Sequence, residues 1–281
     1  YLKDSFVVRC ERVGLHDFNS LEVEKAIGEL IKRDYKIRAD LDNPKTIVFI
    51  DIIDNDCFVG IDFSGIRISR RYYRIKLLSS SINPVVAYSM LRYSGINEND
   101  FILDVFCRSG EIPIEAALFL NNIPNCYYVK DKLQFTKFID IKFDDNIENK
   151  KLNIVSMDCS QNSVRASEIN AKIAFVNKFI RFTRLELDWL DTKFDKETVT
   201  KIITFPPYPS NSFPVKLAEK FYNELFNQAK YILKKNGLIT LLTPKKDMIE
   251  KYALMYKFTK VKEIELVMGK NKFNILVFQK D

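Results

Sequence analysis

The sequence predicts an α/β fold in which a small N-terminal α/β domain precedes a larger, doubly wound parallel sheet. Apolar strands alternate with amphipathic helices, and this alternation becomes longer and more regular after residue 84. Aspartates stand where three strands are predicted to end, at Asp104, Asp158 and Asp188. In addition, 47% of the 281 residues are hydrophobic and 29% are charged, a balance typical of a chain that folds around a buried core.

The first 63 residues have the pattern of a compact α/β domain. Asn19 is the expected N-cap of its helix, and Glu22 lies in the first helical turn. Strands are predicted at residues 6–10, 46–53 and 57–63. Because the chain begins with Tyr1 rather than Met, we expect this domain to be N-terminally incomplete.

Residues 64–81 are predicted to form a basic linker. No acidic residue occurs between Asp62 and Glu98, and two tyrosines lie among the basic residues. Arginine and lysine beside aromatic rings suit phosphate neutralisation combined with base stacking, so we expect nucleic-acid contacts here. The residues expected to make them are Arg67, Arg70, Arg71, Tyr72, Arg74 and Lys76. The alternative is a solvated connector whose charges pair with acids elsewhere.

Residues 82–281 are predicted to form the doubly wound sheet. Pro84 opens its first helix, and Gly237 is the expected C-terminal cap of a long helix that begins near Val215. The other helices are predicted around residues 114–120 and 166–176. Strands are predicted at residues 101–103, 153–157, 180–187, 202–204 and 238–242, with a closing antiparallel hairpin at 262–267 and 272–279. Residues 125–152 are expected to be an insertion with short strands of its own.

The aspartates at the strand ends predict a nucleoside site, because ligands of an open parallel sheet bind beyond the carboxyl ends of its strands. Asp158 suits a ribose diol, since its carboxylate accepts two hydroxyl hydrogens. Asp188 follows the next strand and can accept the hydrogens of an adenine amino group. For any one of these residues the alternative is a helix cap or a turn residue.

A second site is predicted after the fourth strand, at Phe205, Pro206, Pro207 and Tyr208. Two prolines remove two N–H donors, so the backbone presents carbonyl oxygens. The ring of Tyr208 offers a face on which a planar base stacks. Such a site would hold an exocyclic amine, with carbonyl oxygens accepting its hydrogens and its lone pair turned toward an electrophile. The alternative is a proline turn that leads into the next helix.

Several classes of protein are excluded by what the chain lacks. No two glycines are separated by one residue, which excludes the G-x-G-x-x-G dinucleotide motif. Ile66 and Arg67 stand where a P-loop needs lysine and serine or threonine. The single histidine, His16, excludes a multi-histidine cage, so we expect no metal. The cysteines form no C-x-x-C pair and no apolar run is long enough to span a membrane, so we expect a cytoplasmic protein with reduced thiols and no membrane segment.

Residues 104–117 read DVFCRSGEIPIEAA, which is similar to the D-P-F-C-G-S-G-T-I-P-I-E-A-A motif of the Rossmann-like RNA methyltransferases that carry a THUMP domain. Residues 204–208, TFPPY, resemble the T-N-P-P-Y motif of the same family. Residues 8–20 look like the core of a THUMP domain, and residues 69–74 look like the family's linker. The likeness covers nearly the whole chain apart from residues 125–152, and it is greatest to the archaeal and bacterial tRNA guanine-N2 methyltransferases.

This resemblance implies a Rossmann-like class I methyltransferase that uses S-adenosyl-L-methionine and acts on RNA, with tRNA favoured. Residues 1–63 would be the THUMP-like RNA-binding domain, 64–81 the linker and 82–281 the methyltransferase domain. The cofactor residues that it implies are Asp104, Phe106, Arg108, Gly110, Asp158 and Asp188. The target base would be seated by Phe205, Pro206, Pro207 and Tyr208.

Two residues depart from the family pattern at the site itself. Arg108 replaces a glycine of the cofactor loop, where it either fills the methionine pocket or pairs with the cofactor carboxylate. Phe205 replaces the asparagine that accepts a hydrogen bond from the target amine, and losing one positioned polar group costs about 10²–10³ in rate. Val105 replaces proline, and Glu111 replaces threonine without a role carried onto it.

These departures leave more than one function open. The first is an active tRNA guanine-N2 methyltransferase. The second is a catalytically weakened or inactive paralogue that acts as an RNA-binding protein. A methyltransferase of DNA or protein amines is the third, because the Pro-Pro-Tyr motif also suits the N6 amine of adenine. The THUMP-like segment favours RNA over DNA and protein.

Overall fold

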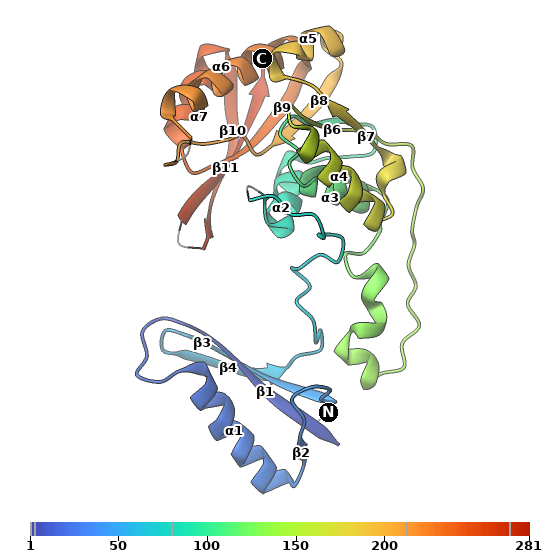
Figure 1. The fold of residues 1–281 in the computed structure, drawn as a ribbon, viewed down its shortest axis with the longest axis vertical. Helices are drawn as coiled ribbons and strands as arrows, with labels where there is room; N and C mark the ends of the chain where they lie inside the picture. The colour runs from blue at the N-terminus through green and yellow to red at the C-terminus, as the bar shows by residue number, and fades with distance from the viewer. Residues whose placement is uncertain (1, 3, 80, 212, 270) are drawn as a thin grey trace. The chain divides into compact units, whose positions relative to one another are not determined.

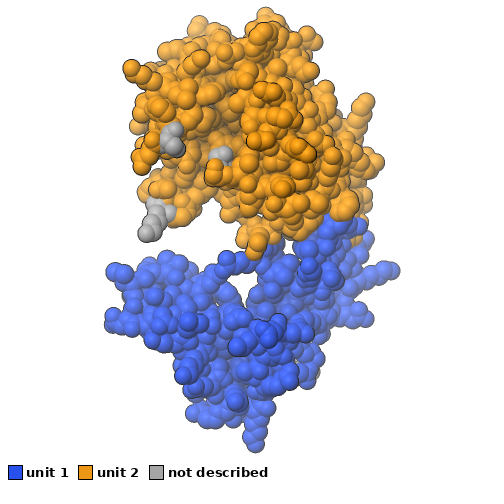
Figure 2. Space-filling view, in the orientation of Figure 1, with its two compact units in different colours: residues 1–68, 126–144 blue, residues 69–125, 145–281 orange. Residues whose placement is uncertain are grey.

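The computed structural model describes residues 2, 4–79, 81–211, 213–269 and 271–281. The chain forms two compact units: unit 1 comprises residues 1–68 and 126–144, and unit 2 comprises residues 69–125 and 145–281 (Figure 2). The first boundary follows residue 68, inside the predicted linker 64–81. The larger part of that segment therefore packs with unit 2.

Unit 1 is a four-stranded sheet of order β2-β1-β3-β4 with one long helix, α1, along one face (Figure 1). Its elements are β1 (Ser5–Val13), α1 (Ser20–Tyr35), β2 (Arg38–Ala39), β3 (Thr46–Ile53) and β4 (Asp56–Ile61). Asn19 and Glu22 form a capping box at the start of α1. Ile27 of α1 packs against a buried cluster that includes Phe6 and Ile50. The predicted helix and strands of this region are confirmed.

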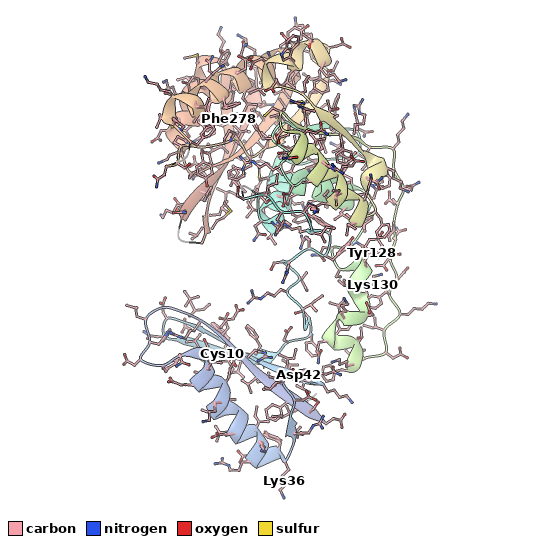
Figure 3. All side chains as sticks on the ribbon, viewed as in Figure 1. Cys10, Lys36, Asp42, Tyr128, Lys130 and Phe278 are labelled. Atoms are coloured by element: carbon pink, nitrogen blue, oxygen red, sulfur yellow. The ribbon has the colours of Figure 1, made fainter. Side chains whose placement is uncertain are left out.

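The insertion at residues 125–152 forms short 3-10 helices rather than strands. All of its residues are described, and its regular segments are η1 (Tyr127–Lys132) and η2 (Gln134–Lys137), so the prediction of short strands is wrong. Figure 3 labels Tyr128 and Lys130 in η1, which belongs to unit 1. The Nε2 of Gln134 donates hydrogen bonds to the carbonyl oxygens of Pro44 and Lys45 at 2.9 and 2.7 Å. These side-chain contacts anchor the segment without strand pairing.

Unit 2 contains a seven-stranded sheet of order β10-β11-β9-β8-β5-β6-β7. Its strands are β5 (Phe101–Asp104), β6 (Asn153–Asp158), β7 (Ile180–Arg184), β8 (Val199–Thr204), β9 (Leu233–Thr243), β10 (Phe258–Met268) and β11 (Asn271–Lys280). The five strands from β9 to β7 run parallel. The antiparallel pair β10 and β11 confirms the predicted hairpin.

Helices cover both faces of this sheet, which confirms the doubly wound fold. The helices are α2 (Pro84–Ser94), α3 (Glu111–Leu120), α4 (Gln161–Ile173), α5 (Leu190–Lys193), α6 (Val215–Ile232) and α7 (Lys246–Met255). Leu103 of β5 is buried in a cluster with residues of α5, α6 and α7, and this cluster includes Phe278 (Figure 3). Its neighbour Ile102 is buried in a second cluster with residues of α2, α3 and α4. No helix in the described ranges is both long and apolar enough to cross a membrane.

Two predicted boundaries in unit 2 are wrong, and α7 was not predicted. Helix α6 ends before Leu233, which takes an extended conformation and is fully buried in the core as the first residue of β9. Gly237 therefore lies inside β9, and Asn236, with a φ of 62°, is the residue in the left-handed region. Strand β7 ends at Arg184, so Asp188 lies in the 3-10 turn that follows, η4 (Leu187–Trp189).

Candidate functional site

Asp104, the last residue of β5, is the most deeply buried acid at the carboxyl edge of the parallel strands. It is 1% exposed, and its Oδ1 accepts hydrogen bonds from Thr204 Oγ1 at 2.6 Å and from the backbone N–H of Phe106 at 3.2 Å. Thr204 ends β8, the neighbour of β5, so the two strand ends are bonded together. Burial raises the pKa of Asp104 to about 7, although both donors act to lower it.

Asp158 ends β6, on the other side of β5. Its Oδ2 accepts the backbone N–H of Arg108 at 3.2 Å, and its Oδ1 accepts that of Ser160 at 2.9 Å. The structure thus places the two predicted carboxylates at neighbouring strand ends. Asp188 is exposed in η4, beyond the end of β7, and its contact with adenine stays a prediction.

The loop between β5 and α3 takes a left-handed backbone conformation at two residues. Gly110, with a φ of 86°, is the N-cap of α3, and a Cβ there would lie 2.2 Å from the Oγ of Ser167, so glycine is required. Arg108 has a φ of 50°, which costs roughly 1–2 kcal/mol in a residue with a side chain. Phe106 fixes the start of the loop by an edge-to-face contact with Phe221, with ring centroids 5.9 Å apart.

Phe205 lies in an aromatic cluster beside the ends of these strands. Its side chain is buried, its ring stacks on Tyr208 with centroids 5.7 Å apart, and it meets the edge of Phe273 at 6.2 Å. The guanidinium carbon of Arg108 lies 4.5 Å from the centroid of the Phe205 ring, a cation–π distance. Arg108 and Phe205, which both depart from the family motifs, therefore contact each other.

A pocket of about 450 Å³ opens beside this aromatic cluster. Its lining includes Asn83, Arg108, Pro207, Tyr208 and Phe273, whereas Pro206 is buried. This volume lies within the range of small-molecule sites. The pocket combines aromatic rings with the donors of one guanidinium. Arg108 connects it to the strand ends, because this residue lines the pocket and donates its backbone N–H to Asp158.

A cavity of about 800 Å³ lies in unit 1 and is remote in sequence from these strand ends. The acids Glu11, Glu24 and Asp51 line it together with Arg9 and Arg67. Asp62 also lines it, so four acids face two arginines, and the cavity has no excess of positive charge that would favour phosphate. Within the described part of the chain, no three or more His, Cys, Asp or Glu side chains are grouped so that they could hold a metal ion.

Two of the predicted RNA contacts are engaged inside unit 2. Arg71 donates from Nε and Nη2 to the Glu115 carboxylate at 2.8 and 3.0 Å, and the hydroxyl of Tyr73 donates to the same carboxylate at 2.8 Å. Arg74 donates from Nε to Glu111 at 3.2 Å. The two acids of α3 thus bind both guanidinium groups, and contact of Arg71 and Arg74 with RNA stays a prediction.

Contact of the other four linker residues with RNA likewise stays a prediction. Arg67, Arg70 and Lys76 are exposed, while Tyr72 is half-buried and contacts a neighbouring tyrosine ring. Neither Glu111 nor Glu115 is among the residues that the sequence predicts for the site. The sequence of α3 does indicate that both acids need partners. Two acids on an otherwise apolar helix must find cationic or hydrogen-bonding groups when that helix is buried.

Two family models match the chain. A THUMP domain matches residues 1–62, and an "RMKL-like, methyltransferase domain" matches residues 71–273. The second match alone covers more than half of the chain.

Curated proteins and solved structures are similar along most of the chain. The tRNA (guanine(6)-N2)-methyltransferase of Methanocaldococcus jannaschii is 31% identical over 94% of this chain and 73% of its own length. The enzyme of the same name from Archaeoglobus fulgidus is 26% identical over 85% of this chain, which spans 60% of that relative. The crystal structure of TrmN from Thermus thermophilus superposes with a TM-score of 0.74 at 23% identity, covering 99% of this chain and 72% of TrmN. That likeness shows a shared fold.

Proposed function

The chain belongs to the RMKL-like methyltransferases that carry a THUMP domain, and we propose that it methylates the N2 amine of a guanine in tRNA. The cofactor is S-adenosyl-L-methionine, and the substrate is RNA. The observation that carries the proposal is the placement of Asp104 and Asp158 at neighbouring strand ends, next to a pocket lined by Pro207 and Tyr208. The names of the two archaeal relatives support the choice of tRNA and of guanine N2.

The acids at the strand ends fit this cofactor. The Asp158 carboxylate has acceptor capacity beyond its two backbone donors, so it would hold the ribose hydroxyls. Asp104 would face the methionine end, beside the loop that Gly110 allows to pass close to α4. When bound, S-adenosylmethionine supplies an electrophilic methyl group on a sulfonium sulfur. Asp188 would accept the adenine amino hydrogens from η4.

The base pocket would orient the amine. Tyr208 offers a ring face to the guanine, and the carbonyl oxygen of Pro206 accepts an amine hydrogen, which turns the nitrogen lone pair toward the methyl group. Phe205 gives no acceptor of its own. Catalysis therefore depends on holding the two reactants together, an effect that can supply several kcal/mol, roughly 7–11 at best.

Unit 1 supplies RNA affinity through its THUMP domain, and the exposed Arg67, Arg70 and Lys76 extend that affinity toward unit 2 along the sequence. Because a tRNA substrate is present in the cytoplasm, the protein acts there.

A methyl-transfer assay tests the proposal. The protein is incubated with methyl-labelled S-adenosylmethionine and with unmodified tRNA transcripts, duplex DNA or a peptide mixture. We expect label in tRNA alone, at least tenfold less label with Asp158→Ala, and no change with Arg92→Gln, whose arginine lies on α2. A folded protein that binds S-adenosylhomocysteine but labels no tRNA would instead be the inactive RNA-binding paralogue.

A further inference from the structure

Glu111, the first residue of α3, holds a buried carboxylate oxygen that lacks a partner. The residue is 1% exposed, and its Oε1 accepts from Arg74 at 3.2 Å. Its Oε2 is buried and has no hydrogen-bond partner among the described residues. Leaving such an oxygen unsatisfied costs about 1–3 kcal/mol, and more for a charged group. A ligand that brings an N–H donor would remove this cost.

Arg108 lies three residues before Glu111 and is the one side-chain cation of the described segment 104–111, which contains the loop between β5 and α3. Its guanidinium is held against the Phe205 ring and lines the 450 Å³ pocket. The charges of Asp104, Asp158 and Glu111 all act to raise the pKa of Arg108 against the effect of burial, which places all three acids within electrostatic reach. The guanidinium thus stands in an acid-rich surrounding.

The charge pattern of the loop is complementary to an amino-acid zwitterion. An α-ammonium group offers three hydrogens, and an unsatisfied buried carboxylate oxygen requires one. An α-carboxylate offers two acceptor oxygens, which suit the planar donors of a guanidinium. Arg108 and Glu111 therefore present one group of each sign, on either side of Gly110.

We propose that Arg108 and Glu111 bind the amino-acid end of the cofactor, with Glu111 accepting from the α-ammonium and Arg108 donating to the α-carboxylate. This inference rests on the proposed function, since it assumes S-adenosylmethionine at these strand ends. It assigns a joint role to two residues that replace threonine and glycine of the family motif.

Two neighbours act as positioning residues in this arrangement. Phe205 holds the guanidinium of Arg108 by its ring face, and Arg74 binds the Oε1 of Glu111 while Oε2 is left buried without a hydrogen-bond donor. Phe205 thereby gains a role that does not require it to touch the target amine. The Arg108→Gly change would relieve backbone strain but remove the proposed carboxylate contact.

Calorimetric titration with truncated ligands tests the proposal without RNA. The ligands are S-adenosylhomocysteine, its decarboxylated analogue, its deaminated analogue and 5′-methylthioadenosine. For the wild type we expect removal of either charged group to weaken binding about tenfold to hundredfold. For Arg108→Gln, loss of the carboxylate should change affinity less than about threefold while loss of the amine keeps its effect. Glu111→Gln should show the reverse pattern.

Matched controls are Arg92→Gln, which removes another arginine stacked on an aromatic ring, and Glu168→Gln, an acid paired with Lys172 on α4. Both should keep the wild-type pattern, and thermal unfolding confirms that each variant is folded. Arg108→Gln that binds S-adenosylhomocysteine as tightly as wild type, or more tightly, would overturn the proposal and show that Arg108 obstructs the pocket.

The cofactor site and the role of Arg108 and Glu111 in it can be refuted independently. If the wild type binds S-adenosylhomocysteine and Asp158→Ala weakens that binding, the cofactor site stands whatever the Arg108 and Glu111 variants show. If a folded wild type binds none of the ligands, both the proposed function and this inference are wrong.

Discussion

Glu115→Ala should strongly destabilise unit 2, because it leaves a buried arginine without its carboxylate. The side chains of Arg71 and Glu115 are only 6% and 3% exposed, and two hydrogen bonds of 2.8 and 3.0 Å join them. The Tyr73 hydroxyl adds a third donor to the same carboxylate. Removing one partner of such a pair costs about 3–5 kcal/mol, since the other charge stays buried. At about 2–4 °C per kcal/mol, the melting temperature of unit 2 should fall by roughly 6–20 °C.

Urea unfolding followed by tryptophan fluorescence measures this loss. The single tryptophan, Trp189, lies in unit 2, so its signal reports that unit. Glu265→Ala is the control, because it breaks an ion pair with Lys272 whose side chains are 57% and 73% exposed, and it should cost less than about 1 kcal/mol.

A double variant separates the cost of an unpaired buried charge from the cost of lost side-chain packing. Arg71→Met with Glu115→Leu replaces both ions by apolar groups of similar volume and should be more stable than Glu115→Ala alone. If Glu115→Ala costs less than 1 kcal/mol, the pair is not a buried anchor, and the guanidinium of Arg71 is free to leave Glu115 for an RNA phosphate.

Three further predictions concern the strand-end site. Asp158→Ala should weaken S-adenosylhomocysteine binding at least tenfold in calorimetry, and unchanged affinity would remove the ribose assignment. Gly110→Ala should lower the free energy of unfolding, measured in urea, by more than about 2 kcal/mol, because the new Cβ would lie 2.2 Å from the Oγ of Ser167 and alanine is strained at a left-handed φ. Equal stability of the variant and the wild type would contradict that geometry. Because burial raises the pKa of Asp104 to about 7, the folded state retains a proton that the unfolded state has lost, so wild-type stability relative to Asp104→Asn should fall as pH rises from 4 to above 7. A stability difference independent of pH across that window would refute this reasoning.

The strand ends could be predicted because buried parallel strands are short apolar runs with sharp ends. Asp104 and Asp158 each follow such a run and stand where expected. Asp188 does not end a strand, although the sequence predicts that it does. The strand that begins at Ile180 is only half buried and ends at Arg184, whereas apolar residues continue beyond it to Leu187 in η4. Hydrophobicity alone does not show where pairing with β6 stops.

The linker and the insertion depend on contacts between distant residues, which local patterns do not contain. The segment around Arg71 and Arg74 is basic and polar, which favours RNA contact, yet both guanidinium groups bond to acids of α3. Gln134 shows the same effect in unit 1, where one buried amide bonds to two carbonyl oxygens of a distant loop. The Arg108–Phe205 contact likewise joins the loop after β5 to the loop after β8.

The most direct test of the central claim is to identify the modified nucleoside. Unmodified tRNA transcripts are treated with the protein and S-adenosylmethionine, digested to nucleosides and analysed by mass spectrometry against authentic standards. We expect N2-methylguanosine, at a level at least tenfold lower when Asp158→Ala replaces the wild type. N6-methyladenosine as the product, or no methylated nucleoside from a protein that binds the cofactor, would contradict it.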